Sequence, residues 1–128
     1  MRIVLGISLV IALAGCTAPP AFVVDASEEP TLIAAGSRPE VFTQAEVGGT
    51  LVNVDGCFGL ENEFGRNVVI FPVGTTRSGS GLDLPTLGRV DLGYTLSGSG
   101  GYGSQGSPEA LACAAVAGGE VAYLNPLD

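Results

Sequence analysis

Short apolar runs separated by Gly, Asn and Pro follow one another after residue 48, and this pattern predicts an all-β domain. Residues 50–55 alternate between apolar and polar side chains, which indicates a half-buried strand. The run 68–71 is continuously apolar and closed by Pro72, as expected of a strand buried on both faces. Residues 120–124 predict a last strand before the chain ends.

The clearest alternation lies in residues 89–96, which predict one strand with a packed face and a wet face. The packed face consists of Val90, Leu92, Tyr94 and Leu96. The Gly/Ser-rich stretch 97–106 predicts a flexible loop. Ser107 and Pro108 then have the order of an N-cap and a first helical residue, so 110–117 predicts one short helix that ends at the following glycines.

These elements define the expected fold class. Four or five short strands and one helix in about 80 residues predict a mainly β fold. Its architecture is a small antiparallel β-barrel or half-open sandwich with one short helix near the C-terminus. We assign this β-barrel-like domain to residues 46–128.

The stretch 16–45 has a different composition. It carries four prolines and several acids without a convincing period, which predicts an extended acidic tether. Residues 22–24 and 31–35 are nevertheless apolar enough to dock on the domain as an edge strand, so this alternative stays open.

The first residues read as a secretion signal. Arg2 precedes an apolar run over 3–14, which fits the about 7–15 residues of a signal-peptide core and is shorter than the roughly 17–25 of a membrane-spanning helix. Leu13-Ala14-Gly15-Cys16 resembles the bacterial lipobox, and the resemblance implies a lipoprotein signal peptide at 1–15 and a lipidated (palmitate-type) Cys16. An uncleaved signal anchor and a conventional signal peptide cut further on are the alternatives.

The order of several short motifs resembles a group of small uncharacterised bacterial envelope lipoproteins. The motifs are Gly56-Cys57-Phe58-Gly59, the run 69–75, the Leu92-Gly93 step, Gly100-Gly101-Tyr102 and the late Cys113. The resemblance covers roughly residues 48–125. It implies a fold and a location, and no activity.

Composition excludes several function classes. The 128 residues include 5 basic and 13 acidic side chains, for a net charge of −8, with no His, and all basic residues are Arg. Without His or Lys there is no Ser/His/Asp or Cys/His nucleophile system, so we expect no enzyme and no cofactor. The acidic balance also argues against a nucleic-acid partner, because binding phosphates needs a basic patch.

Besides Cys16, the chain has two cysteines. In the oxidising envelope Cys57 and Cys113 are expected to form a disulfide. The alternative, two thiolates of a metal site, lacks a nearby His or second Cys to complete a tetrahedral ligand set.

Three further patterns suggest binding sites. Asp55, Glu61 and Glu63 offer hard oxygen ligands of the kind that Ca²⁺ takes, although a solvated acidic rim or a glycosidase-like acid pair would use the same residues. Gly98, Gly100 and Gly103 match the dinucleotide fingerprint without the strand–turn–helix context that it needs. The arginines could form an anion site if they converged, and otherwise serve as ion-pair partners; they are Arg66, Arg77 and Arg89.

The leading functional hypothesis is therefore a lipid-anchored lipoprotein on the extracytoplasmic face of the cell membrane. It would act as a binding or scaffolding module in the cell envelope, held to the membrane through Cys16 and free to bind an envelope protein. The alternative is a lipoprotein that binds a small ligand or a cation such as Ca²⁺ at the barrel mouth and the Asp55/Glu61/Glu63 rim.

Overall fold

The computed structural model describes residues 22–38, 44–103, 113 and 120–127, and every structural statement below refers to these residues. The predicted signal segment, Cys16 and the predicted helix at 110–117 lie outside them, apart from Cys113.

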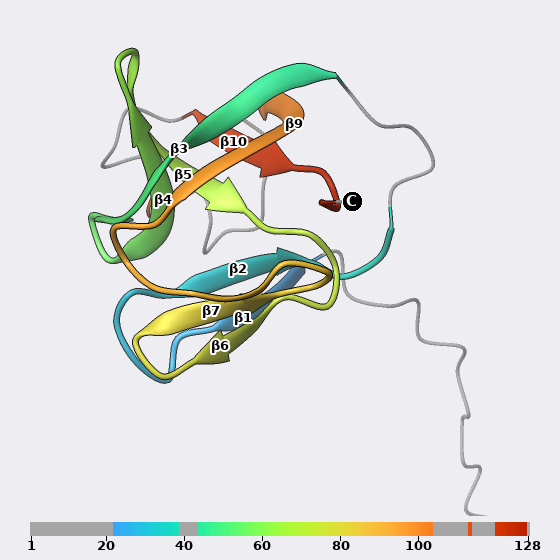
Figure 1. The fold of residues 1–128 in the computed structure, drawn as a ribbon. Helices are drawn as coiled ribbons and strands as arrows, with labels where there is room; N and C mark the ends of the chain where they lie inside the picture. Colours follow the sequence, from blue (N-terminus) through green and yellow to red (C-terminus); the bar gives the residue numbers. More distant parts are fainter. Residues whose placement is uncertain (1–21, 39–43, 104–112, 114–119, 128) are drawn as a thin grey trace, which may run out of the picture.

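Five strands form a closed barrel, in the order β10-β5-β4-β3-β9 (Figure 1). They are β3 (Ala45–Val54), β4 (Cys57–Asn62), β5 (Gly65–Ile70), β9 (Thr95–Gly103) and β10 (Val121–Leu124). The predicted mainly β fold with a small barrel is thus confirmed. All neighbouring strands in the barrel are antiparallel except β10 and β5, which are parallel.

A second layer of short strands lies against one end of this barrel, below it in Figure 1. It contains the hairpin β1 (Phe22–Asp25) and β2 (Leu32–Ala35), and the three-stranded sheet β6 (Thr76–Ser78), β7 (Gly81–Leu84) and β8 (Gly88–Val90). We call this the layered end. The far end is the opposite one, where β3, β5 and β10 begin and β4 and β9 end.

The hairpin corrects the prediction of a tether over 16–45 for the residues described there. Leu32, Ile33 and Ala34 are almost fully buried, so the docked alternative is the one observed. The hairpin joins the barrel through backbone hydrogen bonds: Phe58 N donates to Thr31 O at 2.9 Å. These contacts join residues that are distant in sequence. The composition of residues 16–45 alone could therefore not predict them.

The core has two parts. The larger fills the barrel and continues into the second layer; it includes Leu51, Phe58, Leu60, Val69, Phe71, Leu82, Leu84, Leu96 and Leu124. The smaller covers the outer side of β4, β5 and β10; it includes Ile33, Val54, Cys57, Val68, Ile70 and Val121. The run 68–71 faces both parts and is fully buried, as its continuous apolar pattern predicted.

The predicted strand over 89–96 is wrong. The chain turns between β8 and β9, with Gly93 at a φ of 95°, and the side chains of Leu92 and Tyr94 are each 44% exposed. The predicted loop over 97–106 is also wrong for the part described, because Thr95–Gly103 is strand β9. Its glycines permit close approach to neighbouring strands: a Cβ on Gly100 would overlap the carbonyl oxygen of Tyr123.

Candidate functional site

The far end of the barrel carries a hollow of about 540 Å³. It is lined by Glu46, Asn62, Phe64, Gly65, Arg66, Asn67, Tyr102 and Glu120. These residues come from the ends of β3, β4, β5 and β9, from the turn between β4 and β5, and from the position just before β10. The hollow is therefore the barrel mouth.

Part of the polar lining holds the rim together. The Tyr102 hydroxyl donates to the carbonyl oxygen of Glu46 at 3.1 Å. The Asn62 amide donates to the carbonyl oxygen of Gly48 at 2.9 Å and accepts from the backbone N–H of Phe64 at 2.9 Å. These bonds fix the hairpin turn and the end of β9 relative to β3.

The remaining lining offers groups for a ligand. Within the described chain, the carboxylates of Glu46 and Glu120 and the Asn67 amide make no ion pair or hydrogen bond. Two aromatic rings stand beside them, since Phe64 is 90% and Tyr102 42% exposed. Acceptors, an amide and aromatic faces around one concavity suit a small ligand that has both polar donors and an apolar surface.

The predicted calcium ligands do not come together. Asp55 lies in the turn before β4, at the layered end, whereas Glu61 and Glu63 lie at the far end. The strand between them spans about 20 Å at the usual rise per residue. Among the described residues there is no group of three or more side chains that could hold a metal ion.

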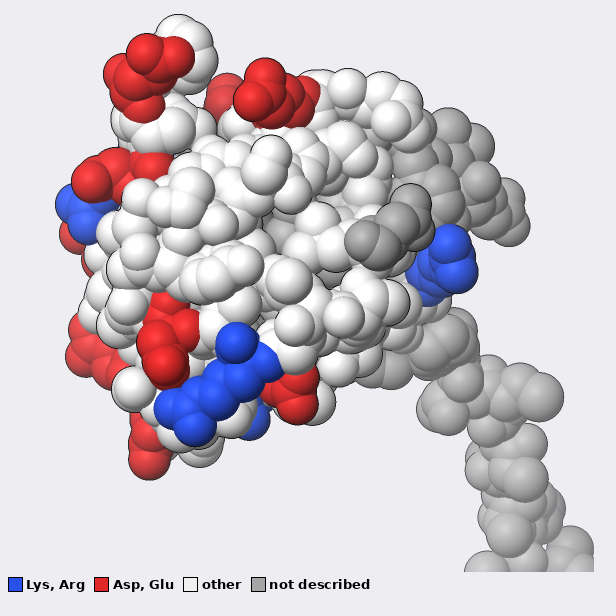
Figure 2. All heavy atoms as spheres, in the orientation of Figure 1, with Lys and Arg blue, Asp and Glu red and all other residues white. Residues whose placement is uncertain are grey.

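The three arginines do not converge on an anion site; each pairs with a different acid, which is the ion-pair alternative given above. The pairs are Arg66–Glu61 at 3.1 Å, Arg77–Asp25 at 3.6 Å and Arg89–Asp91 at 3.1 Å. Two of them are exposed, with about half of each side chain in solvent. Such pairs contribute little stability in water. Figure 2 shows the same mixture of acidic and basic side chains around this face of the molecule.

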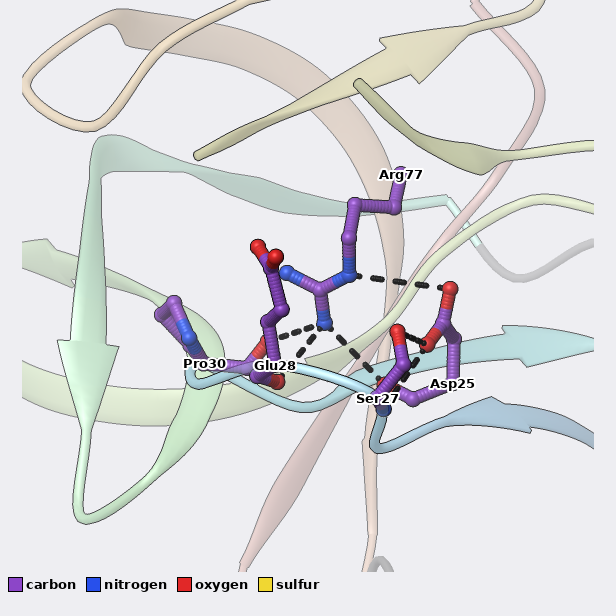
Figure 3. Close-up of polar contacts among 5 residues, drawn as sticks. All are labelled: Asp25, Ser27, Glu28, Pro30 and Arg77. Carbon is purple, nitrogen blue, oxygen red and sulfur yellow. Dashed lines mark hydrogen bonds and ion pairs between the residues drawn. The ribbon is translucent and has the colours of Figure 1, made fainter. Parts of the chain in front are cut away.

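Arg77 differs from the other two because its side chain is only 9% exposed. Its Nη2 donates to three backbone carbonyl oxygens in the turn between β1 and β2: Asp25 at 3.1 Å, Glu28 at 3.0 Å and Pro30 at 2.5 Å (Figure 3). The guanidinium also lies over the Phe58 ring. Arg77 thus fixes the turn of the N-terminal hairpin to the rest of the fold.

Asp25 completes this contact. Its Oδ1 accepts from the Ser27 hydroxyl at 2.5 Å and from the Ser27 backbone N–H at 3.0 Å. These hydrogen bonds, assisted by the positive charge of Arg77, lower the pKa of the Asp25 carboxyl below its ordinary value. The Nε and Nη1 atoms of Arg77 are buried without a hydrogen-bond partner, so the charge of Asp25 is the main compensation at that side of the guanidinium.

The predicted disulfide between Cys57 and Cys113 is confirmed. The two Cα atoms are 6.1 Å apart and the residues are separated by 56 positions. Cys57 begins β4 and is fully buried in the smaller core. The bridge therefore attaches Cys113 to the outer side of the barrel.

Gly98, Gly100 and Gly103 all lie on β9, whose pairs with β3 and with β10 are antiparallel. This is not the loop between a parallel strand and a helix that a dinucleotide site requires. Sequence reasoning missed Asn67 and Tyr102 at the barrel mouth. Tyr102 could be recognised only if β9 were predicted as a strand. The many glycines of β9 have no side chains, so the sequence shows no apolar and polar alternation there.

Within residues 22–38, 44–103, 113 and 120–127, no helix is long and apolar enough to cross a membrane. Comparisons of the chain with protein-family models, curated proteins and solved structures find no match.

Proposed function

We propose that the chain is a lipid-anchored binding module of the cell envelope, held to the extracytoplasmic face of the membrane through Cys16. It would bind a partner and catalyse no reaction. The sequence motif at Cys16 and the acidic, His-free composition support this proposal.

The position of the first strand limits how far the fold could lie from the proposed anchor. β1 begins at Phe22, so five residues separate it from Cys16. A chain of this length spans at most about 20 Å, and an anchor on Cys16 would hold the N-terminal hairpin within that distance of the membrane. The hairpin belongs to the layered end, so the barrel mouth lies on the part of the fold away from the attachment point.

Metabolic labelling tests the anchor directly. The full chain is expressed in a bacterial host with a labelled fatty acid, beside the variant Cys16→Ser, and both are fractionated. We expect label and membrane fractionation for the original chain and neither for the variant. Equal fractionation of both chains without label would contradict the proposal. Cys113→Ser is the matched control, because it also replaces one cysteine by serine and should keep the label.

The barrel mouth favours a second candidate function, the binding of a small polar ligand. The observation behind it is the hollow at the barrel mouth. There the carboxylates of Glu46 and Glu120 and the amide of Asn67 have no hydrogen-bond or ion-pair partner among the described residues, and they lie beside exposed aromatic rings. A panel of saccharides, amines and Ca²⁺ can be screened by the shift in melting temperature, which rises for any ligand that binds the folded state. A shift that Glu120→Gln abolishes and Glu28→Gln leaves intact would support this function. A melting temperature insensitive to the whole panel would exclude these ligand classes.

A further inference from the structure

A groove of about 440 Å³ runs beside the first half of β9, away from the barrel mouth. The side chains of Leu87, Tyr94, Pro126 and Leu127 contribute to its lining. Its floor is the strand itself, including Ser97. Leu87 and Tyr94 are 42% and 44% exposed, so the groove has an apolar wall in contact with solvent.

The floor of this groove is an unfinished sheet edge. On one side, β3 pairs with every residue of β9 from Thr95 to Gly100. On the other side, β10 pairs with β9 only from Gly100 to Gly103. One more backbone hydrogen bond, from Asn125 N to Ser99 O at 2.9 Å, extends the contact. From Thr95 to Gly98, no strand of the described chain pairs with β9 on this side.

The direction of the backbone groups follows from these bonds. Ser99 O points toward the C-terminal segment, whereas Tyr94 O points toward β3, where it accepts from Leu51 N at 2.8 Å. Residues in a strand alternate between the two sides, and β9 pairs with β3 from residue 95 onward without a bulge. The N–H and C=O groups of Thr95 and Ser97 therefore point into the groove.

The C-terminal segment leaves β9 after Asn125. Pro126 holds its φ at about −65°, away from the extended φ of an antiparallel strand, before Leu127, the next position that could bond to β9. The segment instead turns toward Thr86, whose hydroxyl donates to the carbonyl oxygen of Leu127. The result is a gap between β9 and the chain that would otherwise have covered it.

We propose that this groove binds an extended peptide segment of a partner protein, which adds as a strand to Thr95–Ser97 of β9. Unpaired backbone groups at strand spacing are satisfied best by another backbone, and strand addition is a common mode of peptide recognition. Side chains of the added strand would contact Leu87 and Tyr94, which line the groove. The net charge of −8 favours a basic peptide.

This inference deepens the proposed binding function by naming the partner class, and it does not depend on the anchor. Failure of the labelling experiment would leave it intact, and its own failure would leave the anchor intact. A second copy of this chain is a poorer occupant, because two acidic chains repel one another.

Fluorescence anisotropy of the purified full chain tests the proposal. The probe is a labelled heptapeptide of alternating valine and threonine with a lysine at each end. Ser97→Pro removes the free N–H without removing a hydrogen bond to β3, and Ser97→Ala is the matched control that keeps the N–H. We expect saturable binding to the original chain and to Ser97→Ala, and a Kd at least about tenfold higher for Ser97→Pro.

The same probe with every backbone amide N-methylated keeps the test valid if Ser97→Pro does not fold. It should not bind the original chain, because it cannot form a strand ladder. The proposal is overturned by equal binding of the methylated probe or of folded Ser97→Pro, or by no binding of the plain probe up to about 1 mM. Self-association of the chain that Ser97→Pro abolishes would assign the edge to a second copy instead.

Discussion

The guanidinium carbon of Arg77 lies 5.5 Å from the centre of the Phe58 ring. Phe58 belongs to barrel strand β4 and Arg77 to β6 in the second layer, while the carbonyl groups that Arg77 binds belong to the turn of the N-terminal hairpin. One side chain therefore links three parts of the fold. A cation over an aromatic face is favourable, and more so when it is shielded from water.

Replacing Arg77 by methionine should lower the free energy of unfolding by about 2–4 kcal/mol. Methionine fills much of the space but leaves three carbonyl oxygens and Asp25 without their donor. Urea unfolding followed by circular dichroism measures the change. Arg89→Met is the control, because that arginine is exposed and should cost less than about 0.5 kcal/mol. Equal losses in the two variants would mean that the buried contacts of Arg77 do not stabilise the fold.

Reduction of the Cys57–Cys113 bridge should lower the free energy of unfolding by about 4 kcal/mol. The bridge closes a loop of 56 positions, and this value is the chain-entropy estimate for a loop of that length. Thermal unfolding with and without a reductant measures the loss. Cys113→Ser should already show the lower stability and should not respond to the reductant; a further drop on reduction would contradict this account.

Asp25 should make stability depend on pH in the acid range. Its pKa is lowered in the folded state, so its contribution is present above the ordinary value of 3.8 and is lost as the pH falls through the lower folded pKa. Asp25→Asn should remove this part of the acid dependence, with an effect below about 1 kcal/mol because the carboxyl is partly exposed.

The measurement is the urea midpoint at a series of pH values from neutral to acid. Asp83→Asn is the matched control for the loss of one carboxylate, since Asp83 is exposed on β7. A pH profile of Asp25→Asn that superimposes on that of the original chain would contradict the prediction.

Gly100→Ala should destabilise the barrel by at least about 2 kcal/mol. The added methyl group would overlap the backbone of Tyr123, so β10 could not stay paired with β9. Gly98→Ala is the matched control on the same strand. Its methyl group would meet only the flexible ends of Leu124 and Leu127, at 3.0 Å, and should cost less than about 1 kcal/mol. The melting temperatures of the two variants measure the difference. An equal decrease in both would count against the steric argument.

The elements that sequence predicted well are those whose pattern is local and dense. The run 68–71 is apolar at every position, and such a run is buried on both sides wherever the strand lies. The pairing of Cys57 with Cys113 needed only a count of cysteines and an oxidising compartment.

Other elements were missed because non-local contacts form them. The docking of Leu32–Ala35 depends on Arg77 and Phe58, which are distant in sequence. Alternation in 89–96 was misleading, because Gly93 at positive φ turns the chain in the middle of the pattern. For the same reason the sequence predicted a barrel mouth, but not the set of residues that lines it. Glu46, Asn67 and Tyr102 come from three different strands, and Glu120 precedes a fourth.

The parallel pairing of β10 with β5 affects the order in which the molecule can fold. β10 lies between β5 and β9, so the barrel wall stays open until residues 121–124 are available. A chain that lacks them has open edges on both of these strands. Closure of the barrel therefore requires the last of the described strands, whose contacts with β5 span more than fifty positions, and contacts of such long sequence separation form late in folding.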